Sequence, residues 1–443
     1  MNFTKIALAA VATLAVVGQA QAGTRYLTGA SATALNASKA LIKLCQDAPN
    51  SGFATVFKDS TSTSALGNFF TVKCFTTAGR TIAKDFAGLT GTDTVAFNVD
   101  GGSFTAVEAS TGNVPVKFSP AAGTTAITGS GVLLLSDFGA PLVQSTATGS
   151  QLSEGGFMDV EPAAFGTLID SFGGLDALAP NVAPAAFNQV FGVAVSKALY
   201  DALQADQGLA DGTDERAPAA QPTISRAQYA TIVAADFNDP KTLGAAFLNL
   251  PVTKGTAIPS NKLTVCRRVS TSGTQAASNQ YFLNKLTGGT TGVGGYTPEA
   301  DAASFPATGP DALAKFAVTE HATTGLARTC LSSTSAYAIG VLSLENTPAL
   351  TDNYRFVKLS RVEGFDVTTS ASTRSKATAK TGEYDFVFNS QKYTAAGAGT
   401  SDVIEAIDKE LSDLTAFNGL FGAADSLYNR GGNNANVITK KTP

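Results

Sequence analysis

Cys266-Arg267-Arg268-Val269-Ser270-Thr271-Ser272-Gly273-Thr274 is the stretch of this chain that decides the predicted fold. An apolar segment with Leu263 and Val265 precedes it, and the sequence of residues 275–286 predicts a helix. A helix that begins at Ser272-Gly273-Thr274 presents unpaired backbone N–H groups and the positive end of its dipole. Glycine lets a ligand approach the backbone, the two hydroxyls add donors, and an upstream arginine adds a planar pair of N–H groups. The stretch therefore predicts a cradle for an oxyanion, with an ordinary strand end and a capped helix as the alternative.

Two earlier stretches predict the same order of strand, loop and helix. Residues 25–27 predict a short strand, residues 28–33 a loop of small side chains, and residues 34–45 a helix with apolar residues at helical spacing. Residues 69–74 alternate like a strand, and we expect Thr76 and Thr77 to open another helix that turns Ile82 and Phe86 inward. For the first of these loops, an ordinary strand-to-helix turn is an equally good interpretation.

The rest of the chain continues the alternation. Strands are predicted at residues 93–99, 190–195, 336–345 and 384–388, and helices at positions where Ser196, Ser225 and Asp402 can cap them. Strands that alternate with helices imply an α/β fold. Such sheets bind ligands at the carboxyl ends of parallel strands, where the three predicted loops lie.

Length and charge limit the classes of function. A chain of 443 residues can bury one or two sizeable cores. Its formal net charge is −4; without Lys5 of the signal described next, 30 basic residues stand against 35 acidic ones, which gives −5. No basic tract is present, so we expect no nucleic-acid partner. Because the net charge is negative, an anion site in this protein must depend on a few positive charges and N–H dipoles that point at the ligand.

Residues 1–22 predict a secretory signal. Lys5 supplies the positive charge, residues 6–17 are apolar, and Ala20-Gln21-Ala22 is a typical cleavage site. The apolar segment is too short to span a bilayer, and the sequence has no other long apolar run. No cysteine follows the cleavage site, so we expect a periplasmic or secreted protein without a lipid anchor.

The pattern Arg268-x-x-x-Ser272-Gly273-Thr274 resembles the Arg-x-x-x-Ser-Gly-Thr signature of periplasmic phosphate-binding proteins, the receptors of phosphate ABC importers. The segment from Gly29 to Thr33 resembles the Gly-Ala-x-Ala-Thr segment with which these proteins open.

Two further segments extend the resemblance. Asp159 lies in a segment that resembles the family's buried Ser-Asp pair, although Met158 stands where the family has serine. The loop Asp100-Gly101-Gly102-Ser103 resembles a Gly-Gly-Ser loop of a longer branch of substrate-binding proteins. The ligand set that the resemblance implies is Thr33, one of Thr76 or Thr77, Asp159, Arg268, Ser272, Gly273 and Thr274.

The resemblance also implies a type II periplasmic binding protein fold, with a ligand cleft between two lobes. Residues 23–189 would form the first part of lobe 1, with a Gly/Thr-rich insertion at about 109–153 in which residues 132–135 predict a strand. Residues 190–345 would form lobe 2, and residues 346–428 would return to lobe 1. We expect residues 429–443 to be a disordered tail.

Export makes disulfides plausible for the four cysteines, which allow three connectivities. We expect Cys45–Cys74 and Cys266–Cys330, because each pair then stays within one lobe. A metal site is the weaker interpretation, since there is no Cys-x-x-Cys and His321 is the only histidine.

The function predicted first is a monomeric, exported binding protein that captures phosphate or a similar oxyanion for an ABC importer, without catalysis or cofactor. The alternatives are an extracellular structural or adhesive protein that reuses the fold, and a secreted hydrolase. A hydrolytic triad would have to use His321, and no Gly-x-Ser-x-Gly turn is present.

Overall fold

The computed structural model describes residues 23–47, 49–59, 66–77, 82–111, 115–123, 125–127, 140–145, 148–209, 219–234, 263–284, 316–334, 337–348, 351–360, 377–395, 401–413, 419–429 and 439–440. The predicted signal and residues 132–135 lie outside these ranges. Among the described residues, no helix has the length and apolar character needed to cross a membrane.

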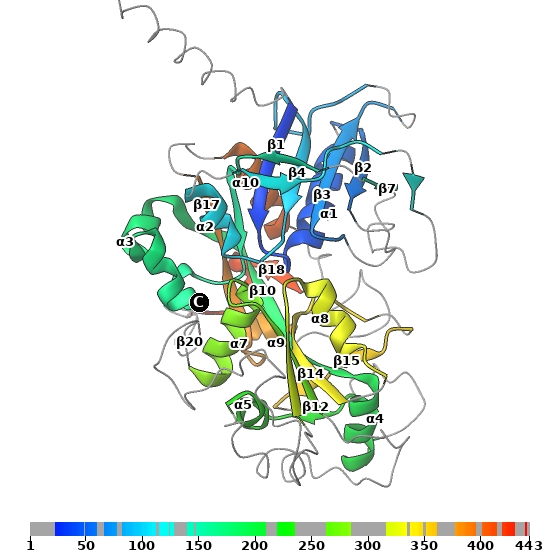
Figure 1. The fold of residues 1–443 in the computed structure, drawn as a ribbon, viewed down its shortest axis with the longest axis vertical. Helices are drawn as coiled ribbons and strands as arrows, with labels where there is room; N and C mark the ends of the chain where they lie inside the picture. Colours follow the sequence, from blue (N-terminus) through cyan, green and yellow to red (C-terminus); the bar gives the residue numbers. More distant parts are fainter. Residues whose placement is uncertain are drawn as a thin grey trace, which may run out of the picture.

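Strand β10 (Val182–Ser196) joins two lobes of one mixed sheet (Figure 1). Its residues 182–190 pair with β17 (Val387–Thr394), and its residues 191–195 pair with β14 (Tyr337–Ser343). We call the parts on these two sides lobe 1 and lobe 2. Its residues 190–195 are a continuous apolar run in sequence, and every residue from Phe187 to Ser196 is buried. A strand that is covered on both faces needs this composition.

Lobe 1 contains β1 (Gly23–Gly29), which lies between the parallel strands β4 (Thr92–Asn98) and β9 (Gly155–Met158). Beyond β4 the order is β3 (Phe69–Phe75), β2 (Phe53–Lys58), β7 (Leu142–Gln144) and β6 (Thr125–Ala126). Strand β18 (Leu420–Gly422) pairs with β10. Helices α1 (Ala34–Gln46) and α10 (Asp402–Asp413) share a buried cluster with these strands.

Lobe 2 contains β12 (Leu263–Arg268), which lies between the parallel strands β13 (Phe316–His321) and β14. Strand β15 (Tyr354–Phe356) pairs with the end of β10, and β11 (Thr223–Ile224) pairs with β16 (Lys358–Leu359). The helices here are α4 (Lys197–Asp206), α5 (Arg226–Ala234), α7 (Gly273–Leu283), α8 (Thr324–Leu331) and α9 (Ala377–Thr381).

Short elements complete the described chain: α2 (Thr105–Thr111), β5 (Val116–Phe118), β8 (Gly149–Gln151), η3 (Pro162–Phe172), α3 (Gly174–Leu178), η4 (Ala179–Asn181), η6 (Ala423–Asp425), β19 (Tyr428–Asn429) and β20 (Thr439–Lys440). Helix α2 and β9 belong to lobe 1, yet Phe104, Met158 and Phe165 join the buried cluster of lobe 2. Segment η3 packs against α7. The two lobes are therefore in close contact here.

The predicted α/β class is confirmed, and so are several helix starts. The Ser196 hydroxyl accepts from the Leu199 N–H at 3.4 Å at the start of α4. Ser225 and Gln228 form the expected capping box, with bonds of 2.8 and 3.0 Å. In the helix that begins at Asp402, the apolar residues Val403, Ile404, Ile407 and Leu411 are fully buried.

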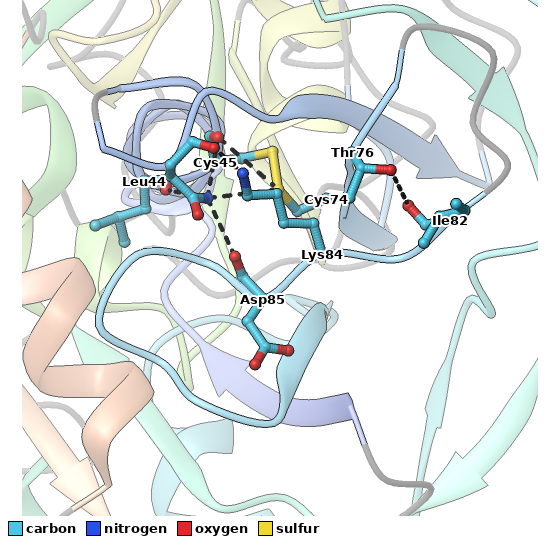
Figure 2. The surroundings of a disulfide bond; sticks show 8 residues. Leu44, Cys45, Cys74, Thr76, Ile82, Lys84 and Asp85 are labelled. Atoms are coloured by element: carbon cyan, nitrogen blue, oxygen red, sulfur yellow. Dashed lines mark hydrogen bonds between the residues drawn. A yellow bond between two sulfur atoms is a disulfide. The ribbon is translucent and has the colours of Figure 1, made fainter.

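Both expected disulfides are present, and each lies within one lobe: Cys45–Cys74 in lobe 1 and Cys266–Cys330 in lobe 2. The Cys45–Cys74 bond links α1 to β3 (Figure 2).

Three expectations about the path of the chain are wrong. Among the described residues 82–91 there is no helix, and Ile82 is 61% exposed instead of facing inward. The chain does not return to lobe 1 at residue 346, because β15 still pairs with residues 194–196 of β10. The tail is not wholly without structure, since β19 and β20 pair across Tyr428–Asn429 and Thr439–Lys440.

We expect Gly156→Ala to destabilise the protein. Gly156 pairs with Thr28 of β1, and a Cβ added at Gly156 would overlap the Thr28 carbonyl oxygen. Forcing one strand away from its neighbour should lower the free energy of unfolding by roughly 1–3 kcal/mol, measured by urea denaturation. Gly149→Ala is the control, because a Cβ there meets no atom within 4 Å. Equal stability of the two variants would contradict the tight pairing of β1 and β9.

Candidate oxyanion site

Arg268 ends β12 at the contact between the lobes, and only 1% of it is exposed. Its Nε donates to the His321 carbonyl at 3.1 Å, and Nη2 donates to the Ala322 carbonyl at 2.8 Å. Its Nη1 donates to two hydroxyls, Ser31 Oγ of lobe 1 at 3.1 Å and Thr324 Oγ1 of lobe 2 at 2.7 Å. The guanidinium is thus held by both lobes through neutral acceptors.

The charge of Arg268 is buried without a direct counterion among the described residues: no carboxylate oxygen lies within 4.0 Å of its guanidinium. Burial lowers the pKa of Arg268 to about 10, against the opposing attraction of Asp159 and Asp100. A buried guanidinium is costly unless negative charge lies close to it. The arrangement therefore favours an anion in this region.

Asp159 follows β9 and is also buried, with 1% of it exposed. Its Oδ2 accepts a hydrogen bond from Ser103 Oγ at 3.0 Å, while its Oδ1 is buried without a partner among the described residues. Burial raises the pKa of Asp159 to about 7, although the Ser103 hydroxyl and Arg268 both favour the ionised form. The carboxyl group can therefore gain or lose a proton near neutral pH, and it has an oxygen free to accept a hydrogen bond.

The N-terminus of α7 packs directly against this carboxyl group. A Cβ added at Gly273 would lie 2.7 Å from Asp159 Cβ and 2.9 Å from Asp159 Oδ2, and it would also overlap Ser103 Oγ. Glycine is therefore required at this position by close approach. The first N–H groups of a helix lack partners within the helix, so the end of α7 places positive potential beside Asp159.

Ser272 and Thr274 flank Gly273, and both are buried. Ser272 is the N-cap residue of α7, yet its side chain makes no capping hydrogen bond. Gln275 in the first turn of α7 accepts from the Arg268 backbone N–H at 3.0 Å and so fixes the strand end against the helix. The structure brings the predicted Arg268, Ser272, Gly273 and Thr274 together with Asp159.

Thr33 lies at the N-terminus of α1, where its hydroxyl donates to the Ala30 carbonyl at 3.2 Å. Its neighbour Ser31, which we did not single out from the sequence, makes the contact with Arg268. The predicted loop is thus placed at the site.

Thr76 and Thr77 lie away from this site. Strand β3 runs antiparallel to β4, with Lys73 opposite Thr94, so β3 ends beside the start of β4. The Thr76 hydroxyl donates to the Ile82 carbonyl at 3.4 Å, near the Cys45–Cys74 disulfide (Figure 2). Along the chain, β4 is the next strand after β1 that runs parallel to it. The second strand-to-helix turn therefore follows β4, and its hydroxyl is that of Ser103, in the Gly-Gly-Ser loop before α2. Our expectation that Thr76 or Thr77 occupies this turn is therefore wrong, and the motif Gly101-Gly102-Ser103 was the sequence signal for the right position.

His321 lies beside Thr319 and the Cys266–Cys330 disulfide. Its Nε2 lies 3.0 Å from Thr319 Oγ1, and burial lowers its pKa, with a further contribution from Arg268. The sulfur atoms of Cys266 and Cys330 lie near it, but both belong to the disulfide and are not thiolate ligands.

No protein-family model and no curated protein matches this sequence. The solved structures that are similar to it share little sequence identity with it. A candidate phosphate ABC transporter substrate-binding protein with bound phosphate from Clostridium perfringens is 10% identical; the match covers 95% of this chain and 100% of that one, with a TM-score of 0.40. A possible phosphate-binding protein from Planctomyces limnophilus DSM 3776 is 12% identical, with 88% of each chain covered and a TM-score of 0.30.

The third structure is a variant of full-length OxyR from Pseudomonas aeruginosa, which is 8% identical. The match covers 91% of this chain and 71% of that chain, with a TM-score of 0.30. TM-scores at this level leave the function to be inferred from the site itself.

We expect Asp159 to make the protein less stable as the pH rises. Its pKa of about 7 in the folded protein exceeds the ordinary value of 3.8, so the folded state binds the proton more tightly than the unfolded state does. The free energy of unfolding should therefore fall between about pH 4 and pH 7, by at most about 1.4 kcal/mol per pH unit.

Asp159→Asn should abolish this decrease in the free energy of unfolding with pH. The measurement is urea unfolding in phosphate-free buffer at several pH values. Asp170→Asn, at an exposed position of η3, is the matched control and should follow the wild-type curve. A wild-type curve that coincides with that of Asp159→Asn would show that Asp159 is not the titrating group.

Proposed function

We propose that this protein is an exported binding protein that captures phosphate, or a similar tetrahedral oxyanion, between its two lobes. The observation that carries the proposal is Arg268, whose buried guanidinium is bound by neutral groups of both lobes and has no carboxylate at ion-pair distance among the described residues. An anion beside it would offset the cost of burying the charge and would strengthen the contact between the lobes.

Asp159 gives the proposed site a preference among anions. Phosphate near neutral pH still carries a proton, and an ionised Asp159 can accept a hydrogen bond from it through Oδ1, which is buried without a partner. Sulfate has no proton to donate, so it would place two negative charges together away from water. The site would therefore bind phosphate and exclude sulfate.

The remaining donors come from helix starts. Ser272, Thr274 and the first N–H groups of α7 would hold the anion from lobe 2, and Thr33 and Ser103 would act from lobe 1. Gly273 packs on Asp159, and the Phe104 N–H donates to the Thr271 carbonyl at 2.9 Å. Admission of the anion would require these contacts to open, so capture would be a hinge motion of the lobes about β10.

The resemblance of residues 268–274 to the phosphate-binding signature supports a receptor role for an ABC importer, and the signal-like residues 1–22 support export to the periplasm or beyond. In this proposal the protein is a monomer, binds without catalysis and needs no cofactor.

A structural or adhesive role is the second candidate. The observation that favours it is the direct packing of Gly273 on Asp159 and Ser103, which joins the lobes through protein contacts alone. Phosphate that remains bound to the purified protein, or that binds on titration, would decide for the first candidate.

Arg268→Ala should weaken phosphate binding. Each charge-assisted hydrogen bond that is lost is worth roughly 1.5–3 kcal/mol, so the dissociation constant should rise at least about tenfold. Titration calorimetry with phosphate is the measurement. Arg267→Ala is the control: Arg267 points toward Glu320, with Nη2 at 3.6 Å from Oε2, and its loss should have a much smaller effect. Equal affinity of wild type and Arg268→Ala would remove Arg268 from the site.

Asp159→Asn should narrow the preference for phosphate over sulfate. The asparagine amide can donate a hydrogen bond to sulfate, whereas the carboxylate of Asp159 cannot. Titrating wild type and variant with both anions tests this at constant pH. A variant with the full preference of the wild type would show that Asp159 does not discriminate between the anions.

A further inference from the structure

A cavity of about 90 Å³ lies between the lobes, and two of its lining residues, Ser31 and Thr324, are hydrogen-bonded to Arg268. Ser31 and Leu35 line it from lobe 1, and Thr324, Gly325, Arg328 and Glu345 line it from lobe 2, whereas Asp159, Ser103 and Gly273 do not. A water molecule needs about 10–15 Å³ of such a cavity, so there is room for about six to nine water positions, and the cavity can hold a small polyatomic ion.

Two hydroxyls on the cavity wall are hydrogen-bonded to Arg268. Ser31 Oγ and Thr324 Oγ1 both accept from Arg268 Nη1, and they lie 2.9 Å from each other. One of the two hydroxyl protons is used in the bond between them. The proton of the second hydroxyl is not needed for that bond, and it cannot be donated to Nη1, which is itself a donor. It can therefore be donated into the cavity, from an oxygen that is polarised by the buried guanidinium.

The other lining groups also favour negative charge. The cavity wall includes the start of α1 at Ala34 and Leu35 and the start of α8 at Thr324 and Gly325. Both helix ends direct N–H groups and the positive end of a dipole at their surroundings. Arg328 also lines the cavity and brings a positive charge, although its Nη2 already lies 3.9 Å from Asp352 Oδ2.

Glu345 is the acidic residue that lines the cavity, and it does not oppose an anion strongly. Its Oε2 already accepts a hydrogen bond from Asn36 Nδ2 at 3.0 Å. Burial raises the pKa of Glu345 well above its ordinary value, and the charge of Asp159 adds to this rise, while Lys39 and Arg328 act in the opposite direction. The carboxyl group therefore keeps its proton to a higher pH than an exposed glutamate does. A cationic ligand is disfavoured by the same surroundings.

We infer that this cavity is a second anion site, separate from the site at Asp159, and that it binds a small tetrahedral oxyanion through Ser31, Thr324, Arg328 and the ends of α1 and α8. Glu345 Oε2 already accepts from Asn36, and burial raises the pKa of this carboxyl group, so we expect the cavity to accept sulfate as well as phosphate. Sulfate is therefore the diagnostic probe. The inference goes beyond the proposed function, because sulfate binding here does not require that Asp159 and Arg268 capture phosphate.

The test is titration of the full-length protein with sulfate, using variants at Gly325. A Cβ added at Gly325 meets no atom closer than 3.8 Å, so there is room for a side chain to begin at this lining position. Leucine would extend further into the cavity, and it favours the helix more than glycine does. Wild type should bind sulfate, and Gly325→Leu should bind it at least about tenfold more weakly, with Gly325→Ala in between. Gly149→Leu, at an exposed position with open space, is the control and should bind as the wild type does.

Two results would overturn the inference: no sulfate binding by the wild type, or equal sulfate binding by wild type and Gly325→Leu. Phosphate titration of the same variants separates the two sites. Phosphate capture that persists in Gly325→Leu would support separate sites. Loss of both anions together in a folded Gly325→Leu would show that phosphate binds only in the cavity; this would overturn the proposed function and leave the cavity as an anion site.

Discussion

The buried charge of Arg268 is the constraint on which the contact between the lobes depends. A guanidinium that is 1% exposed must be hydrogen-bonded on all sides, and its partners come from the β1–α1 loop of lobe 1 as well as from β13 and α8 of lobe 2. Separation of the lobes would break the bond to Ser31 and expose the charge to water. Since water solvates a guanidinium well, this charge does not by itself hold the lobes together. An anion changes that balance, because its attraction to Arg268 is strongest where water is excluded.

The arrangement of strands explains why the site lies where it does. The parallel strands β1, β4 and β9 direct their carboxyl ends to one edge of lobe 1, and β12 does the same in lobe 2. Helix starts and loops with free N–H groups gather at such edges. Asp159 and Arg268 have opposite charge and do not touch. Burial raises the pKa of the first and lowers the pKa of the second, as expected of a pair whose charges are not neutralised by direct contact.

The sequence predicted the elements of this site better than their arrangement. Arg268, Ser272, Gly273 and Thr274 could be identified because they follow one another along the chain, on a strand end and a helix start, where local pattern determines structure. Asp159 could be identified from its place after an apolar strand. Thr76 and Thr77 were misplaced because alternation predicts a strand but not its direction: β2 and β3 form an antiparallel pair before the next parallel strand. The contacts of Ser31 and Thr324 with Arg268 join residues far apart in sequence, and no local pattern encodes such contacts.

The connectivity of the disulfides has a consequence for the order in which the protein can mature. Each bond joins cysteines that are neighbours in the order of the chain, first Cys45 with Cys74 and then Cys266 with Cys330. If the chain crosses a membrane with its N-terminus first, the Cys45–Cys74 bond can close before Cys266 emerges. An oxidase that simply joins thiols as they appear would then produce the native pairing, without the help of an enzyme that reshuffles wrong bonds.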